Sequence, residues 1–212
     1  MENYNISNDS SNFVVISEYI PDVLLDIRYY STFNFVGERI DGYKLPIAII
    51  SKSAAEKLKK VSDYFKEKGY LLKIFDAYRP HKAVMHFVRW AKDIDNQKMK
   101  DYFYPDVDKT KLFELGYIAE KSTHSRGSTV DLTLFDIKTG KDLDMGGTFD
   151  FFGDISHSDY TKLTKEQLDN RKMLHEVMIA NGFKPLEEEW WHFTLMDEPY
   201  KDTYFNFDIN TL

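Results

Sequence analysis

The 212 residues are enough for one domain that buries roughly 70% of the surface of its unfolded chain. The net charge of −7 argues against a nucleic-acid partner, because phosphate binding needs a basic face. The chain has no cysteine, which excludes disulfides and fits a reducing compartment, and no stretch is apolar enough to predict a membrane span.

The polar residues 1–12 predict a flexible N-terminus, followed by a single domain over residues 13–212. The N-terminal segment has neither the basic region nor the apolar run of a signal peptide, so we expect a cytoplasmic protein. Residues 13–20 and 23–30 are β-branched, aliphatic and aromatic, which predicts strands or extended segments. The aromatic run over residues 29–44 either anchors a loop to the core or lines a pocket.

A helix is predicted after residue 53, where Ser53-Ala-Ala-Glu56 matches a capping box. Its apolar side chains follow at helical spacing up to Gly69, which predicts the helix end: Leu58, Val61 and Phe65. Residues 70–75 predict a strand. It leads into Asp76-Ala-Tyr-Arg79, and Pro80 is expected in the first turn of the next helix.

The second helix has a predicted buried stripe of Val84, Phe87, Ala91 and Ile94. Arg79 therefore lies at a strand-to-helix junction, where functional side chains often occur. The alternative for Arg79 is a surface salt bridge. Residues 95–120 are irregular, with a short helix expected around residues 111–115.

Residues 122–134 read Ser-Thr-His-Ser-Arg-Gly-Ser-Thr-Val-Asp-Leu-Thr-Leu, with His124 before a turn-like run and Asp131 after it. The alternation after the glycine predicts a half-buried strand, with Asp131 on the face opposite the apolar residues. A carboxylate there needs a partner, and a metal shared with His124 is one, since zinc accepts both ligand types. Taken singly, His124 can also be a core or surface histidine and Asp131 a turn or cap residue.

Glu189-Trp190-Trp191-His192 offers a third ligand, because a catalytic zinc site has three protein ligands and keeps one position for water. The hypothesis is one Zn²⁺ per chain on His124, Asp131 and His192, with Glu189 beside it as a base. Residues i and i+3 of a straight strand face opposite sides, so Glu189 and His192 converge only if the backbone bends. Glu-x-x-His also occurs by chance in many chains.

Residues 136–163 form a long segment rich in Gly and Asp, of the kind that is usually functional or mobile. It holds Asp150 between two phenylalanines, either as a solvated loop acid or as a functional group. Thr164-Lys-Glu-Gln167 is another capping box. The helix after it is expected to end at Gly182 and to bury a stripe of Leu168, Met173, Leu174, Val177 and Met178.

The string Ser-x-His-x-x-Gly-x-x-x-Asp, followed much later by Glu-Trp-Trp-His, resembles the VanX-type D-alanyl-D-alanine dipeptidases. These are zinc peptidases that share a fold with D,D-carboxypeptidases and the hedgehog signalling domain. The resemblance covers nearly the whole chain and includes Asn34-Phe-Val-Gly37, Asp41-Gly-Tyr43, Asp76-Ala-Tyr-Arg79-Pro80, Met145-Gly146, Phe149-Asp-Phe151 and Asp197-Glu-Pro-Tyr200. It implies a single α+β domain with a central, mainly antiparallel sheet and helices packed on one side and around it.

The resemblance also implies hydrolysis of D-Ala-D-Ala to D-alanine, with Glu189 as general base and Arg79 stabilising the oxyanion. Asp150 would pair with the ammonium of this small zwitterionic dipeptide. The other expected substrate contacts are Ser122, Tyr43 and Tyr29. Preference for D over L residues comes only from the resemblance.

Two other functions remain open at this point. One is another zinc D,D-carboxypeptidase or a peptidoglycan endopeptidase of the same fold, which would act on wall polymers. The other is a zinc-stabilised binding module without catalysis, against which the presence of both Glu189 and Arg79 speaks. The sequence leaves open the oligomeric state, and whether the role is vancomycin-type resistance or D-alanine salvage.

Overall fold

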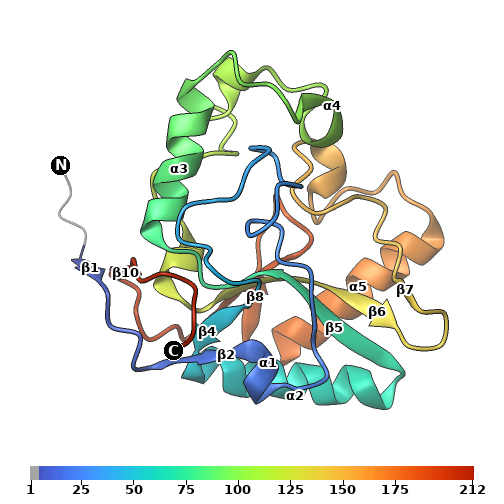
Figure 1. The fold of residues 1–212 in the computed structure, drawn as a ribbon. Coiled ribbons are helices and arrows are strands. Elements are labelled where there is room, and N and C mark those ends of the chain that lie inside the picture. The colour runs from blue at the N-terminus through green and yellow to red at the C-terminus, as the bar shows by residue number, and fades with distance from the viewer. Residues whose placement is uncertain (1–4) are drawn as a thin grey trace.

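The computed structural model describes residues 5–212, and its centre is a six-stranded sheet (Figure 1). Five strands are ordered β3-β5-β6-β9-β8, and β7 pairs with β6. Their bounds are Leu24–Leu25 for β3, Tyr70–Asp76 for β5, Thr129–Asp136 for β6, Lys141–Asp142 for β7, Phe183–Pro185 for β8 and His192–Leu195 for β9. The α+β class is as expected. The sheet is mixed, because β3 is parallel to β5 while the other pairs in this sheet are antiparallel.

Strand β6 is buried on both faces, so the predicted half-buried strand is wrong. Val130 and Leu132 are 0% exposed, but Asp131 and Thr133, which alternate with them, are only 1% and 2% exposed. Helices lie below the sheet, and loops together with a further helix lie above it (Figure 1). Asp131 is therefore withdrawn from bulk water, which sets its chemistry.

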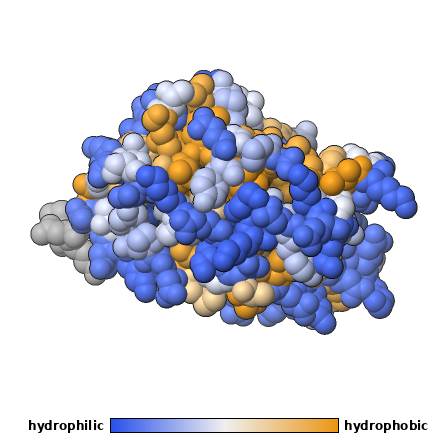
Figure 2. All heavy atoms as spheres, turned by 90° about the horizontal axis from the view of Figure 1, so that it is seen from below, coloured by the Kyte–Doolittle hydropathy of each residue, from blue (hydrophilic) through white to orange (hydrophobic). Residues whose placement is uncertain are grey.

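Helices α2 (Lys52–Glu67) and α5 (Lys165–Ala180) lie below the sheet in Figure 1, and α3 (His81–Lys92) lies above it. The predicted apolar stripe of α2 is fully buried against the core: Leu58, Val61 and Phe65. Hydrophilic side chains cover most of the face seen from below in Figure 2. Such one-sided burial is typical of helices on the surface of a globular domain.

The capping box expected at Ser53 is wrong, because β4 (Ile49–Ser51) runs directly into α2. The N-cap is Ser51, whose Oγ lies 2.7 Å from Ser128 Oγ and makes no capping bond to the helix. The box at Thr164 is present. Gln167 N donates to Thr164 Oγ1 (3.2 Å), and Thr164 N donates to Gln167 Oε1 (2.9 Å).

Several predicted boundaries shift. Pro80 is the N-cap of α3 and not a residue of its first turn, and the helix ends before Ile94, which is 51% exposed. Leu168 of the predicted α5 stripe is 37% exposed. In place of the helix expected at 111–115 there are two short turns, α4 (Lys100–Phe103) and η1 (Lys109–Lys111).

The two ends of the described chain pair with each other. β1 (Asn5–Ser7) is parallel to β10 (Thr203–Phe205), so part of the segment predicted to be flexible is ordered; residues 1–4 lie outside the described residues. β2 (Phe13–Val15) pairs with β4, but α1 (Ile16–Tyr19) replaces the rest of the strand expected over 13–20. Within residues 5–212, no helix has the length and apolar character needed to cross a bilayer.

Candidate metal centre

His124 lies on a tight turn that the local sequence explains. The 3₁₀ turn η2 (Thr123–Arg126) begins after Ser122, whose Oγ accepts a hydrogen bond from His124 N at 3.2 Å. Gly127 then adopts φ +82°, a conformation that favours glycine, and leads the chain into β6. A Cβ at Gly127 would lie 2.3 Å from Phe13 Cε1, so glycine is also required for space.

Three side chains from η2, β6 and β9 converge at the face of the sheet. His124 Nε2 is 3.2 Å from Asp131 Oδ2 and 3.2 Å from His192 Nδ1, and His192 Nδ1 is 3.1 Å from Asp131 Oδ1. Ligands about 2.0–2.1 Å from a tetrahedral zinc ion are themselves about 3.3 Å apart. The three atoms therefore have the separations of a zinc site, as the sequence hypothesis requires.

Hydrogen bonds on the far side of each ring leave these atoms free to bind a cation. His124 Nδ1 lies 2.6 Å from the carbonyl oxygen of Ala77 and donates to it, so Nε2 carries the lone pair. His192 Nε2 faces the hydroxyls of Thr123 (3.3 Å) and Thr194 (3.4 Å). Asp131 Oδ1 is buried and faces His192 Nδ1. When Nδ1 of His192 carries no proton, three acceptors face one point, an arrangement that fits a divalent cation.

The charges of the three groups are strongly linked. Burial alone would raise the pKa of Asp131, but His124 and His192 hold it well below its usual range. Burial alone would lower the pKa of His192, but hydrogen bonds and charge from Asp131 and Glu189 raise it to about 9. Without a cation, the site therefore favours a proton on His192.

Glu189 reaches this centre through a turn. His192 is the first residue of β9, and its backbone N donates to the carbonyl oxygen of Glu189 at 3.2 Å. This turn brings Glu189 Oε2 within 3.3 Å of His192 Nδ1, which meets the condition that the chain bends between them. The side chain of Glu189 is 37% exposed and lines the cavity beside the candidate metal ligands.

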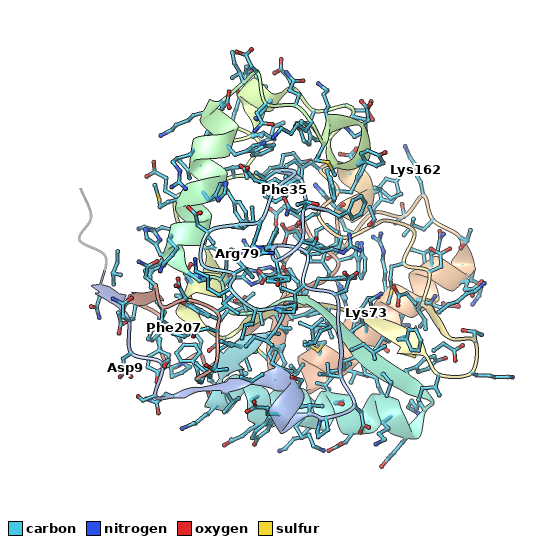
Figure 3. The ribbon with its side chains drawn as sticks, viewed as in Figure 1. Asp9, Phe35, Lys73, Arg79, Lys162 and Phe207 are labelled. Atoms are coloured by element: carbon cyan, nitrogen blue, oxygen red, sulfur yellow. The ribbon has the colours of Figure 1, made fainter. Side chains whose placement is uncertain are left out.

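Arg79 lies on the loop between β5 and α3, near the middle of the molecule in Figure 3. Its Nε donates to Asp76 Oδ2 at 2.9 Å, and its Nη2 is 3.7 Å from Asp131 Oδ2. The guanidinium carbon lies 4.9 Å from the ring centre of Tyr29 and 5.3 Å from that of Phe87. Arg79 is thus a buried cation held beside the metal ligands, and not part of a surface salt bridge.

Asp76 is the functional side chain that the sequence analysis did not select. It is 1% exposed, and besides Arg79 it accepts a hydrogen bond from Tyr43 Oη at 2.7 Å. Burial raises the pKa of Asp76, although the charge of Arg79 opposes this. Tyr43 therefore holds Asp76 and is not among the residues that line the cavity over the candidate ligands, and its contact with a substrate stays a prediction. In the sequence, the signal for Asp76 was a single acidic residue at the end of an apolar strand.

A cavity of about 220 Å³ opens over the three candidate ligands, and three of the residues expected to contact substrate line it: Tyr29, Ser122 and Asp150. This volume is below the ~300–1,000 Å³ of typical ligand pockets. Asp150 is 7% exposed and adopts φ +62°, which is uncommon outside glycine. Its Oδ1 accepts from Tyr29 Oη at 3.1 Å, while its Oδ2 is buried without a partner. Burial raises the pKa of Asp150 well above its usual range.

Comparisons with known proteins find similar chains in one peptidase family. The model of the peptidase M15 family, described as D-Ala-D-Ala dipeptidase, matches residues 9–210. D-alanyl-D-alanine dipeptidase of Enterococcus faecalis is 38% identical over 200 residues, covering 94% of this chain and 99% of the relative. The dipeptidase of Streptomyces coelicolor is 36% identical with the same coverage, and that of Escherichia coli is 30% identical over 89% of this chain and 86% of its own.

Proposed function

Because the chain belongs to the peptidase M15 family of D-Ala-D-Ala dipeptidases, we propose that it hydrolyses D-Ala-D-Ala to two molecules of D-alanine, using one Zn²⁺. The observation that carries the proposal is the convergence of His124, Asp131 and His192 at metal-ligand separations on the floor of a small cavity. A catalytic zinc polarises the scissile carbonyl and lowers the pKa of water, which is the chemistry this reaction needs.

Glu189 is the proposed general base. Its carboxylate is close to His192 Nδ1 and, being partly exposed, can take a proton from the attacking water and pass it to the leaving amine. A second carboxylate of the centre, Asp131, is committed to both imidazoles. Glu189 is therefore the carboxylate that remains available for proton transfer.

Arg79 is the proposed partner of the oxyanion that develops on the attacked carbonyl. It keeps its charge, and Asp76 fixes the orientation of its planar guanidinium through Nε. Asp76 engages Nε and Asp131 lies near Nη2, so the guanidinium is held in one orientation at the wall of the cavity. Preorganised donors of this kind need no reorientation during the reaction.

Asp150 is the proposed partner of the substrate ammonium. Its Oδ2 is buried in the cavity wall and has no hydrogen-bond partner within residues 5–212. A bare buried carboxylate is costly, and an ammonium would relieve that cost. The pairing of Asp150 with a free ammonium in a small cavity favours a dipeptide over the end of a wall polymer.

The test combines zinc content with release of D-alanine by the purified protein. Glu189→Gln should retain zinc but lose a factor on the order of 10²–10⁴ in kcat, because the ligands stay and the base is lost. His124→Ala should lose zinc. The matched control is Glu187→Gln, an exposed acid two residues away, which should behave as wild type.

An undiminished rate in Glu189→Gln would show that another group is the base. The substrate panel is D-Ala-D-Ala, L-Ala-L-Ala and a pentapeptide ending in D-Ala-D-Ala. Preference for the pentapeptide would favour a D,D-carboxypeptidase instead. Zinc removal that unfolds a protein without peptidase activity would favour a binding module. The cytoplasmic location expected from the sequence stays a prediction.

A further inference from the structure

A second cavity of about 530 Å³ lies next to the cavity over the metal ligands. Five residues line both cavities and therefore form the partition between them: Gly116, Tyr117, Phe152, Leu186 and Glu189. The reaction described above uses only the smaller cavity. The second cavity is more than twice as large, so the partition limits how much of a substrate can be accommodated.

The main contact across the partition is between two aromatic rings. Tyr117 stacks on Phe152 with ring centroids 4.7 Å apart and an interplanar angle of 14°. Phe152 is 7% exposed and packs on Phe35 at 5.2 Å and Tyr104 at 6.0 Å, so it is fixed by the core. Tyr117 comes from the loop after Gly116 and is only half-buried. A substitution at Tyr117 can therefore open the partition while Phe152 stays packed in the core.

The second cavity is acidic. Asp154, Glu188 and Glu189 line it, and none of the described residues in its lining is Lys or Arg. Asp154 and Tyr117 line the same cavity, and burial together with the charge of Asp154 raises the pKa of Tyr117. A cavity with this charge suits a cationic group such as the N-terminal ammonium of a peptide.

We propose that Tyr117 is a specificity-determining residue, whose ring on Phe152 closes the smaller cavity and keeps peptides longer than two residues out of the acidic cavity. This inference rests on the proposed dipeptidase function. With the ring removed, a tripeptide would extend past the partition and place its ammonium near Asp154 and Glu188. Asp150 would then face a peptide amide of the tripeptide in place of an ammonium. Burial raises the pKa of Asp150 and so favours its neutral carboxyl group, which can hydrogen-bond to an amide.

The experiment compares zinc-loaded wild type with Tyr117→Ala, Tyr117→Leu and Tyr117→Phe. The substrates are D-Ala-D-Ala and Gly-D-Ala-D-Ala; hydrolysis of the latter consumes one water and gives Gly-D-Ala and D-alanine. The ratio of kcat/KM for the tripeptide to that for the dipeptide should rise on the order of tenfold or more in the Ala and Leu variants. Tyr117→Phe keeps the ring and should keep the wild-type ratio.

Tyr102→Ala is the matched control, because Tyr102 is 63% exposed and lies outside both cavities. An unchanged ratio in Ala and Leu variants that still hydrolyse D-Ala-D-Ala overturns the inference. Loss of both activities in these two variants, with Tyr117→Phe active, would assign the ring to folding and overturn it as well. Absence of D-Ala-D-Ala hydrolysis in wild type refutes the proposed function instead.

Discussion

The ion pair between Arg126 and Glu198 gives a sharp test of how the metal-binding turn is held. Arg126 Nε and Nη2 donate to the two oxygens of Glu198 at 2.8 and 2.7 Å, and the side chains are only 17% and 6% exposed. Arg126 is two residues from His124, in the same 3₁₀ turn. The ion pair thus attaches the C-terminal segment of the chain to the turn that holds His124, a candidate metal ligand.

Glu198→Gln keeps the shape but removes the charge and one of the two acceptors. Removing one partner of a buried ion pair lowers the free energy of unfolding by about 3–5 kcal/mol. Because the oxygen that Gln retains can still accept a hydrogen bond from Arg126, we expect a loss near the lower end, about 3 kcal/mol. The unfolding entropy of ~2.1 cal/mol/K per residue gives about 0.45 kcal/mol/K for this chain, so Tm should fall by about 7 °C. Zinc should also dissociate faster into a chelator, because the turn around His124 is less constrained.

The assay is thermal unfolding of zinc-loaded protein, followed by zinc transfer to a chromophoric chelator. Asp169→Asn is the matched control, since it breaks an exposed i,i+4 pair with Lys165 whose side chains are 60% and 89% exposed. Exposed pairs contribute about 0–1 kcal/mol, so Tm should hardly change. An unchanged Tm together with an unchanged zinc dissociation rate in Glu198→Gln would refute the reasoning.

Two further predictions concern the backbone and the acid–base state of the centre. Gly127→Ala should lower the free energy of unfolding in denaturant titrations by about 2 kcal/mol or more, because the added Cβ would clash with Phe13 at a position with positive φ. Gly140 also has a positive φ, +67°, but open space around it, so Gly140→Ala should lower the free energy of unfolding by only about 1 kcal/mol. The pKa of His192 in the fold, about 9, is higher than that of an unfolded histidine, so the protonated ring stabilises the zinc-free fold. This stabilisation is complete below pH 6.5 and is lost above pH 9. Zinc-free protein should thus melt higher at pH 6 than at pH 9.5, whereas zinc affinity in chelator competition should fall by on the order of tenfold per pH unit from 9 to 7. A zinc affinity independent of pH in this range would contradict the protonation of His192.

The sequence was sufficient for the parts of the centre that depend on local pattern. Chemistry and spacing made His124 and Asp131 candidates, and the resemblance of the full string to a zinc peptidase family favoured the metal-site hypothesis over a core histidine and a turn aspartate. The turn that brings Glu189 to His192 could be stated only as a requirement, since it depends on where β9 begins. The helix cap at Thr164 was predicted correctly because both partners are local in sequence.

Long-range contacts account for what the sequence did not predict. Ser51 is engaged by Ser128, 77 residues away, so the local capping rule fails at that helix. Tyr43 was expected to contact substrate, but Asp76, 33 residues later, takes its hydroxyl. The burial of both faces of β6 likewise depends on loops that show no periodicity in the sequence.

The origin of each cavity residue has a consequence for how this scaffold can diversify. The metal ligands and Arg79 come from strands of one sheet and the turns attached to them. Tyr117, Asp150 and Phe152 come from two loop segments outside the strands of that sheet, although the second segment also carries β7, which pairs with β6. Mutational libraries restricted to the loop residues around these three positions would therefore vary the cavity lining while the candidate metal ligands and Arg79 stay unchanged.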